Sequence, residues 1–254
     1  MSENIQLVFI IPYRNRVEHK HFFERYMKYI LEDYDQSSYL LLYIHQTNER
    51  PFNRGAMKNI GFIYVKQTYP TQYKNMTFIF NDIDTVPYRK NLLEYTTVEG
   101  TVKHFFGFNF ALGGIFSIKG SDFEKIDGFP NYWQWGFEDN IIYKRAIENN
   151  IIVDRSNFYK IGSHQILHFC DAIHKALDKY VLSTQFEKNY KEKDGLSKLK
   201  NVKYNKDKEN MVDVLHFESY YSNDNSNTVM YPVTNGSKIQ NPNKVNKNKT
   251  LLFI

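Results

Sequence analysis

The N-terminal part of the chain alternates between short, wholly apolar runs and longer stretches with a helical repeat of apolar residues. Continuous apolar segments predict strands at Gln6–Ile11, Tyr39–Ile44 and Met76–Phe80. Between them, apolar residues recur every three or four positions over Val17–Tyr34 and Gly55–Gln67, which predicts two helices. Strands that alternate with helices form a largely parallel sheet, so the chain is predicted to be an α/β protein.

Beyond Pro87 the pattern is less regular, and the elements expected there are shorter. They are strands near His104–Phe108 and Ile115–Ile118, helices over Ser121–Ile126 and Glu138–Asn149, and a candidate strand at Met211–Tyr221. We assign residues 1–221 to one catalytic domain. Residues 222–254 are rich in Asn, Lys and Ser with few large apolar residues, so we expect a loop or tail there.

Charge and cysteine content restrict the setting and the partners of the protein. The formal net charge is +5, and eight lysines between Lys188 and Lys208 form either a solvated face or a surface for an anionic polymer or a membrane. We predict no nucleic-acid partner. Cys170 is the single cysteine, which rules out a disulfide within the chain and fits a reducing compartment. The first apolar run is short, ends at Pro12 and follows no basic segment, so we expect neither a signal peptide nor a membrane anchor.

Two carboxylates directly follow the third predicted strand. Asp82 and Asp84 alternate along the chain and therefore share one side of an extended segment. Their hard oxygen ligands suit Mg²⁺ or Mn²⁺, whereas a turn or a helix cap is the plainer explanation. Since ligands of parallel sheets bind beyond the carboxyl ends of the strands, this position favours a metal site.

Basic and aromatic residues follow the other two predicted strands. Arg14 and Arg16 come after the first strand, and Phe52 and Arg54 after the second. Arginine binds phosphate in a fork, and an aromatic ring can stack on a nucleobase. The alternative is surface arginines and a core phenylalanine, but three neighbouring strand ends with such residues predict a nucleotide diphosphate site.

The stretch NYWQWGFEDN at 131–140 places two indoles beside two acids. One interpretation makes the tryptophans core residues and Glu138-Asp139 the charged first turn of a helix, where the helix dipole favours acids. The other makes the stretch part of a sugar site, because the apolar face of a pyranose stacks on an indole and a carboxylate can accept the proton of a hydroxyl.

Taken in order, these motifs resemble the β-1,4-galactosyltransferase family. They are PYRNR (12–16), FNRGAMKNIGF (52–62), DIDTVP (82–87), LGG (112–114), GFPNYWQWGFED (128–139) and DGLSKL (194–199). The resemblance covers roughly residues 5–200, and GFPNYWQWGFED is its most specific motif. It implies a GT-A fold, in which a Rossmann-like sheet with helices on both faces binds a nucleotide sugar. It also implies a metal-dependent glycosyltransferase that inverts the anomeric configuration.

The resemblance further implies which residues bind the UDP-sugar donor and the metal. The donor-binding residues would be Pro12, Arg14, Arg16, Phe52, Arg54, Asp82, Ile83 and Gly114. Asp84 and His168 would ligate the metal, usually Mn²⁺ and alternatively Mg²⁺. Gln165 stands where the family has a methionine ligand, so that ligand is lost or replaced, and the neighbouring His164 is a further candidate.

For the acceptor, a carbohydrate or glycoconjugate, the resemblance implies Trp135 as the sugar platform, with Phe137 and Asp139 beside it. Asp139 would be the general base, which becomes effective as the attacking hydroxyl turns acidic late in the transition state. Glu138 would hold a hydroxyl of the donor or the acceptor.

Departures from the family pattern bear on the substrates. Galactose-specific members have a tyrosine where this chain has Ala111, which predicts that UDP-GalNAc or UDP-GlcNAc is tolerated besides UDP-Gal, unless Phe110 fills the space. Phe137 replaces a common glycine and adds bulk beside the acceptor. Lacking the anchor and disulfides of the animal members, the protein is expected to be soluble, in the cytoplasm or a viral factory.

The alternative functions are a magnesium-dependent nucleotidyl or phosphoryl transferase and a catalytically silent sugar-binding module.

Overall fold

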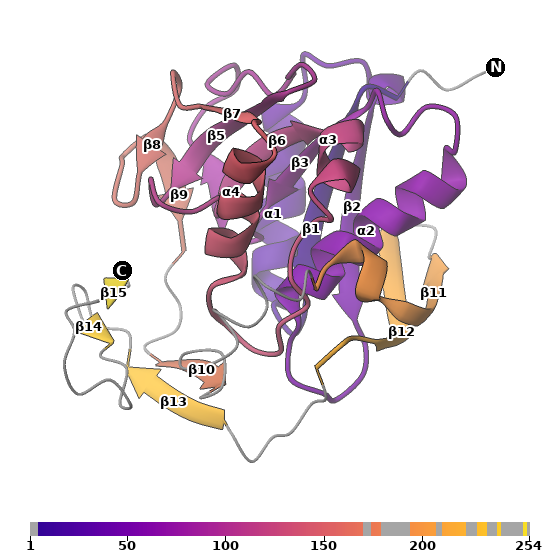
Figure 1. The fold of residues 1–254 in the computed structure, drawn as a ribbon. Helices are drawn as coiled ribbons and strands as arrows, with labels where there is room; N and C mark the ends of the chain where they lie inside the picture. The colour runs from indigo at the N-terminus through magenta and orange to yellow at the C-terminus, as the bar shows by residue number, and fades with distance from the viewer. Residues whose placement is uncertain are drawn as a thin grey trace.

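A nine-stranded sheet forms the centre of the computed structural model, in the order β11-β12-β2-β1-β3-β6-β5-β7 with β8 beside β5 (Figure 1). The structure describes residues 5–169, 174–178, 194–206, 210–221, 228–232, 238–239 and 251–252. The strands of the sheet are β1 (Leu7–Tyr13), β2 (Tyr39–Gln46), β3 (Thr77–Asn81), β5 (Thr101–Gly107), β6 (Ile115–Lys119), β7 (Ile152–Asp154), β8 (Tyr159–Lys160), β11 (Lys200–Lys206) and β12 (Met211–Glu218). The helices are α1 (Val17–Ile30), α2 (Arg54–Thr68), α3 (Gly120–Lys125) and α4 (Glu138–Glu148), with 3-10 turns at Gln36–Ser38 and Leu196–Lys198.

The strands β1, β2 and β3 run parallel to one another, with β1 in the middle. Their carboxyl ends therefore meet at one edge of the sheet, as the sequence predicted. The predicted strands and helices of this region are all present. The first helix is shorter than predicted: it ends at Ile30, and residues 31–34 form turns.

Helices cover both faces of the sheet, α1 on one face and α2, α3 and α4 on the other (Figure 1). Alternate residues of β1 point to opposite faces. Phe9 and Ile11 pack in one core cluster with the α1 residue Phe23, whereas Val8 and Ile10 pack in the other. Burial on both faces explains why the β1 sequence is apolar throughout.

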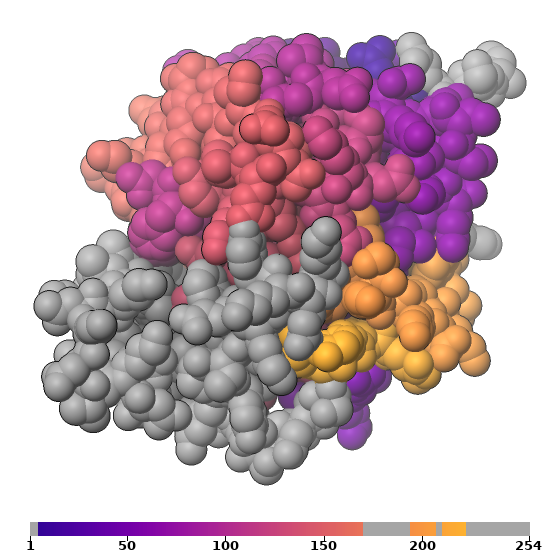
Figure 2. Space-filling view, in the orientation of Figure 1, coloured from indigo at the N-terminus to yellow at the C-terminus, as the bar shows by residue number. Residues whose placement is uncertain are grey.

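The C-terminal half of the domain returns to the first half through β12, which adds to the sheet parallel to β2. In the space-filling view this segment, in orange, lies directly against the N-terminal residues in purple (Figure 2). The strand at Met211 was predicted. Its antiparallel neighbour β11 was not, because the sequence KNVKYNK is mostly polar and this strand lies at the exposed edge.

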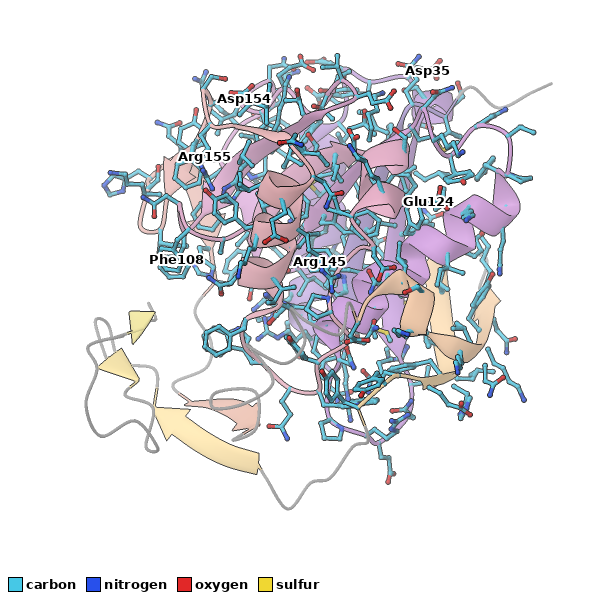
Figure 3. The ribbon with its side chains drawn as sticks, viewed as in Figure 1. Asp35, Phe108, Glu124, Arg145, Asp154 and Arg155 are labelled. Atoms are coloured by element: carbon cyan, nitrogen blue, oxygen red, sulfur yellow. The ribbon has the colours of Figure 1, made fainter. Side chains whose placement is uncertain are left out.

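The DGLSKL segment is held to the body by buried polar contacts. Asn131 donates to the Asp194 carboxylate from its backbone nitrogen (2.8 Å) and from Nδ2 (2.9 Å). Arg145 of α4 (Figure 3) donates to the carbonyls of Gly128 (2.7 Å) and Asp194. The segment therefore braces the loop that leads into α4.

Short strands also occur where we expected a loop or tail. β13 (Thr228–Pro232) pairs with β10 (His174–Asp178), and β14 (Lys238–Ile239) pairs with β15 (Leu251–Leu252). The expectation for residues 222–254 is corrected at these positions, since TVMYP can pair with a distant strand despite its polar surroundings. The other positions of that segment, Cys170 and most of the lysine-rich run lie outside the described residues. Within the described part of the chain, no helix is both long and apolar enough to cross a bilayer.

Candidate functional site

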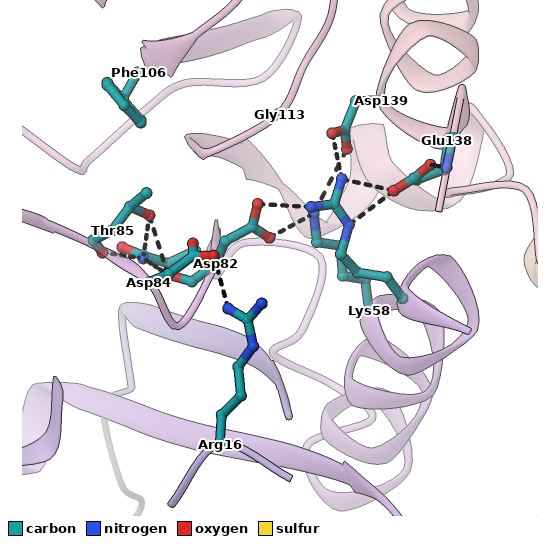
Figure 4. Close-up of polar contacts among 12 residues, drawn as sticks. Arg16, Lys58, Asp82, Asp84, Thr85, Phe106, Gly113, Glu138 and Asp139 are labelled. Atoms are coloured by element: carbon teal, nitrogen blue, oxygen red, sulfur yellow. Dashed lines mark hydrogen bonds and ion pairs between the residues drawn. The ribbon is translucent and has the colours of Figure 1, made fainter. Parts of the chain in front are cut away.

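A cluster of buried charges lies at the carboxyl edge of the sheet, centred on Arg54, the first residue of α2. Its guanidinium donates from Nη1 to Asp82 Oδ2 (2.9 Å), from Nε to Glu138 Oε1 (2.8 Å) and from Nη2 to Asp139 Oδ2 (2.5 Å). These acids come from the turn after β3 and from the first turn of α4, and Figure 4 shows them converging on one point (Figure 4). Four residues predicted from separate motifs are thus brought together.

A second cation in the cluster, Lys58, was not predicted. It follows Arg54 by one helical turn and therefore lies on the same face of α2. Its Nζ is 3.3 Å from Asp82 Oδ1 and 3.7 Å from Asp139 Oδ1, and its side chain is only 1% exposed. The available signal was the i, i+4 spacing from Arg54, but lysine in a helix is almost always exposed.

Burial and ion pairing have opposite effects on the pKa values of Asp139 and Arg54. Burial raises the pKa of the Asp139 carboxyl to about 6, against the lowering effect of Arg54 and then Lys58. Glu138 and Asp82 add to the increase by repulsion. Burial alone would lower the pKa of Arg54, but Asp139, Asp82 and Glu138 hold it well above its usual value. Asp139 is therefore a carboxylate at neutral pH whose proton affinity is higher than that of an exposed aspartate.

Asparagines of α2 hold the loop that carries the acids. Asn59 donates from Nδ2 to the Phe129 carbonyl (2.7 Å) and accepts from the Phe129 backbone nitrogen (2.9 Å). Asn53 caps α2 by accepting from the Ala56 nitrogen (2.8 Å) and donates to the Asn131 carbonyl (3.0 Å). These buried contacts fix the entry to α4, and sequence reasoning missed them because buried asparagine has no pattern of its own.

The backbone before α4 is strained. Gln134 and Phe137 have φ values of 69° and 63°, in the left-handed region that non-glycine residues rarely adopt. Phe137 directly precedes the two acids and is partly buried beside Tyr132 and Ile141. Strain of this kind persists only where the surrounding structure enforces it, and it concentrates at functional sites.

Two glycines of the LGG motif allow the backbone to approach the cluster closely. A Cβ on Gly113 would lie 2.5 Å from Asp139 Oδ2, and the neighbouring Leu112 nitrogen donates to the Asp139 carbonyl (2.8 Å). Gly114 has φ of +68°, and its carbonyl accepts from the Asp82 nitrogen (3.1 Å). The motif therefore links the turn after β3 to the start of α4.

The predicted metal ligands lie on the other side of Asp82. Asp84 accepts from Arg16 Nη1 (2.8 Å), and its carbonyl accepts from the Phe169 nitrogen (2.8 Å). β4 (Thr85–Pro87) pairs with β9 (Ile166–His168), so that His168 stands opposite Thr85 and adjacent to Asp84. This pairing brings the backbone of two predicted metal ligands, which are far apart in the sequence, close together.

A carboxylate and an imidazole fit Mn²⁺, which accepts both ligand types. Within the part of the chain that the structure describes, no group of three or more His, Cys, Asp or Glu side chains is arranged so that it could hold a metal ion. A few protein ligands completed by substrate phosphates is the usual arrangement for Mg²⁺-like ions. Gln165 and His164 are exposed and lie just before β9, and both stay candidates for a further metal ligand.

The remaining predicted donor residues lie around this edge. Pro12 is buried at the end of β1, and Arg14 donates from Nη1 to the Arg50 carbonyl. The Phe52 carbonyl accepts from the Gln134 nitrogen (2.7 Å), which ties the loop after β2 to the acidic loop. Ile83 is buried in the core cluster on the α1 side, so only its backbone is available to a ligand.

The two tryptophans of NYWQWGFEDN have different environments. Trp133 is buried, stacks on Phe217 at 5.2 Å between ring centroids, and lies 3.8 Å under the Arg50 guanidinium. The core interpretation therefore holds for Trp133. Trp135 is half-buried in the strained turn next to the acids, and its role as a sugar platform stays a prediction.

Comparison with known proteins identifies the family. A model of the N-terminal region of glycosyl transferase group 7 matches residues 2–96, and a model of the N-terminal domain of galactosyltransferase matches residues 99–169. The chain belongs to the β-1,4-galactosyltransferase family. Bos taurus β-1,4-galactosyltransferase 1 is 32% identical over 165 residues, covering 60% of this chain and 39% of the relative. Drosophila melanogaster β-1,4-galactosyltransferase 7 is 27% identical over 210 residues, covering 78% of this chain and 62% of the relative.

This family member spans about two fifths of the length of the mammalian relatives it matches, the share being 39% for the bovine protein. Among solved structures, the catalytic domain of the Drosophila β-1,4-galactosyltransferase 7 in complex with xylobiose superimposes with a TM-score of 0.65 at 21% identity, covering 83% of this chain and 94% of that one. A variant of the same enzyme in complex with manganese, UDP-Gal and xylobiose gives a TM-score of 0.62 at 20% identity. These likenesses confirm the predicted GT-A fold.

Proposed function

We propose that this family member is a metal-dependent, inverting glycosyltransferase that moves a hexose or an N-acetylhexosamine from a UDP-sugar to a hydroxyl of a carbohydrate acceptor. The observation that carries the proposal is the cluster in which the half-buried Asp139 carboxylate pairs with Arg54 at the carboxyl edge of the sheet, where Arg54 also pairs with Asp82. Manganese, UDP-Gal and xylobiose in the complex of the Drosophila relative support the same classes of metal, donor and acceptor.

Asp139 acts as the general base in this proposal. Its carboxylate accepts the proton of the acceptor hydroxyl while that oxygen bonds to the anomeric carbon and the bond to the diphosphate breaks. A raised pKa makes it a better proton acceptor than an exposed aspartate, and because that pKa is about 6 the group is still mostly ionised at neutral pH. Because the displacement is a single step from the opposite side, the anomeric configuration inverts.

Glu138 and Trp135 position the sugars. Glu138 is 3% exposed, and Arg54 and the Gly136 nitrogen (3.1 Å) already bind its two oxygens, which fixes the carboxylate for contact with a hydroxyl. Trp135 presents an indole next to the acids, and Phe137 narrows the acceptor side.

Asp84 and His168 would hold the Mn²⁺, which supplies positive charge that stabilises the departing diphosphate. Arg16 pairs with Asp84 at 2.8 Å and would therefore reach a phosphate group bound beside that carboxylate. Together with Arg14 and Arg54 it would provide arginine contacts to the diphosphate of the donor. Positive charge that is already in place stabilises a developing negative charge well in a site shielded from water.

The donor is proposed to include sugars with an N-acetyl group at C2. Ala111 is 4% exposed and offers only a methyl group, whereas Phe110 is 45% exposed and stacks on Phe108 instead of filling the space. We expect Ala111→Tyr to lower the UDP-GalNAc rate relative to the UDP-Gal rate at least tenfold, since a phenol ring takes up the space of the N-acetyl group. The measurement is UDP release with both donors. Strict preference of the unmodified protein for UDP-Gal would contradict the donor proposal.

UDP release also separates this function from the alternatives. A phosphoryl or nucleotidyl transferase would not release UDP from UDP-sugars, and it leaves the Asp139 and Trp135 side of the cluster without a role. A silent sugar-binding module would bind a UDP-sugar without turnover. Metal-dependent UDP release that requires Asp139 is the result expected for the glycosyltransferase.

A further inference from the structure

Lys58 is a buried lysine for which the proposed reaction has no assigned role. Its side chain is 1% exposed, and its ammonium nitrogen lies between Asp82 Oδ1 (3.3 Å) and Asp139 Oδ1 (3.7 Å), with the Phe129 ring centroid at 4.7 Å. It makes no hydrogen bond of ordinary geometry with the described residues. Burying an ammonium is costly without compensation, so its contact with the two carboxylates must be chiefly one of charge.

Without Lys58 the excess of negative charge around Asp139 would be larger still. Among the residues that the structure describes, the ion pairs of the cluster join two cations, Arg54 and Lys58 of α2, to three carboxylates, Asp82 after β3 and Glu138 and Asp139 of α4. Removal of Lys58 would leave one cation facing three acids in a buried space. One of the carboxylates would then take up a proton, and Asp139, the acid with the raised pKa, is the group expected to do so.

We propose that Lys58 is a positioning residue that holds the Asp139 carboxylate in its charged form, ready to accept the proton of the acceptor hydroxyl. Lys58 also ties the base to Asp82, the residue predicted to lie on the donor side. This role rests on the proposed glycosyltransferase function. The competing explanation is that Lys58 only packs between α2 and Phe129, in which case its charge is irrelevant to the base.

Lys58→Met tests the charge while keeping the length of the side chain. We would measure kcat/KM for UDP release between pH 5 and 10 in the unmodified protein and in the variant. Loss of the positive charge should move the acidic limb of the profile upward by about 1–3 pH units, the effect of an opposite charge within 4–6 Å. Activity at pH 7 should fall by a factor of about 2 for a shift of one unit and about 90 for a shift of three units, and it should recover above the new limb.

Lys66→Met is the matched control. It makes the same substitution on the same helix and breaks an ion pair with Glu124, but its side chain is 45% exposed and belongs to no part of the cluster. Its pH profile should match that of the unmodified protein. Lys58→Arg, which keeps the charge, should keep the acidic limb in place even if kcat falls.

Different failures are distinguishable. An unshifted limb in Lys58→Met, or a loss by the same factor at every pH, would overturn the role of Lys58 while the glycosyltransferase function stands. If the unmodified protein releases no UDP from any donor, the proposed function fails, and ¹³C NMR titration of the Asp139 carboxyl in both proteins decides the role of Lys58. An identical titration overturns it.

A second variant covers the case in which Lys58→Met does not fold. In Lys58→Gln, which removes the charge but keeps a polar side chain at the buried position, the acidic limb of the kcat/KM profile should move upward as in Lys58→Met. An unshifted limb in that variant would contradict the proposal.

Discussion

Asp139 is the residue whose surroundings decide the pH at which the proposed reaction runs. Only the carboxylate form can accept a proton, and burial raises its pKa to about 6. We therefore expect kcat/KM for UDP release to be constant above the acidic limb and to fall as the pH drops through about 6. Asp139→Asn should lose about 10²–10⁴-fold at all pH values.

The exposed Asp33 offers the control for that experiment. Asp33→Asn should have the same kcat/KM for UDP release as the unmodified protein, with the acidic limb of its pH profile at the same pH. An acidic limb near pH 4, the value of an ordinary aspartate, would mean that the protein does not hold the base in the environment described here.

Arg54 should matter for stability as well as for the donor. Arg54→Met leaves three buried carboxylates with one cation, so the free energy of unfolding at pH 7.5 should fall by about 3–5 kcal/mol. The pKa of Asp139, already above its unfolded value, would rise further once Arg54 no longer lowers it. The loss of stability should therefore be largest at high pH, where Asp139 is ionised, and smaller near pH 5. Urea denaturation at the two pH values measures this. Equal losses at both pH values, or a comparable loss in the exposed-site control Arg25→Met, would contradict it.

At the residue scale, motifs predicted Arg54, Asp82, Glu138 and Asp139, and the structure brings all four together. Lys58 and Asn59 escaped prediction for a physical reason. Their importance comes from partners that approach through the tertiary fold, and a lysine or asparagine within a helix has no local feature that marks it as buried.

At the level of elements, the approach of the LGG segment to α4 should be sensitive to a single methyl group. Gly113→Ala would place a Cβ 2.5 Å from Asp139 Oδ2 and push the carboxylate aside. A displacement of about 1 Å at a reacting group can cost on the order of 10²-fold in rate, and we expect a loss of that size in kcat with the fold retained.

Gly100→Ala is the matched control, because Gly100 has φ of +79° and no atom within 4 Å of the added Cβ. It should lose some stability through backbone strain but no activity. Full activity in Gly113→Ala, with UDP release and circular dichroism as readouts, would show that Asp139 is free to move.

The elements differ in how far the sequence predicts them. Both faces of β1, β2 and β3 are wholly or largely covered, so their sequences are continuous apolar runs. Such runs can be recognised as strands in the sequence. β4 and β9 are three residues each and exist through their pairing with each other across about eighty positions, so no local pattern marks them. That pairing places His168 opposite Thr85, the residue that follows Asp84.

At the scale of the whole molecule, the parallel order β2-β1-β3 creates the edge where the site forms. The sequence predicted this convergence because parallel strands share a carboxyl edge. The return of β12 to the side of β2 was not predictable, since the strand itself is visible in the sequence but its neighbour depends on the path of the intervening chain.

Metal-dependent sugar transfer at this edge of the sheet is the central proposal. The decisive measurement is UDP release from a panel of UDP-sugars, with Mn²⁺ and with chelator, for the unmodified protein, Asp84→Ala and the control Asp33→Ala. We predict turnover of at least one donor with Mn²⁺, abolished by chelator and by Asp84→Ala but retained in Asp33→Ala. Turnover that survives both chelation and Asp84→Ala, or no turnover of any donor by the unmodified protein, would contradict the account.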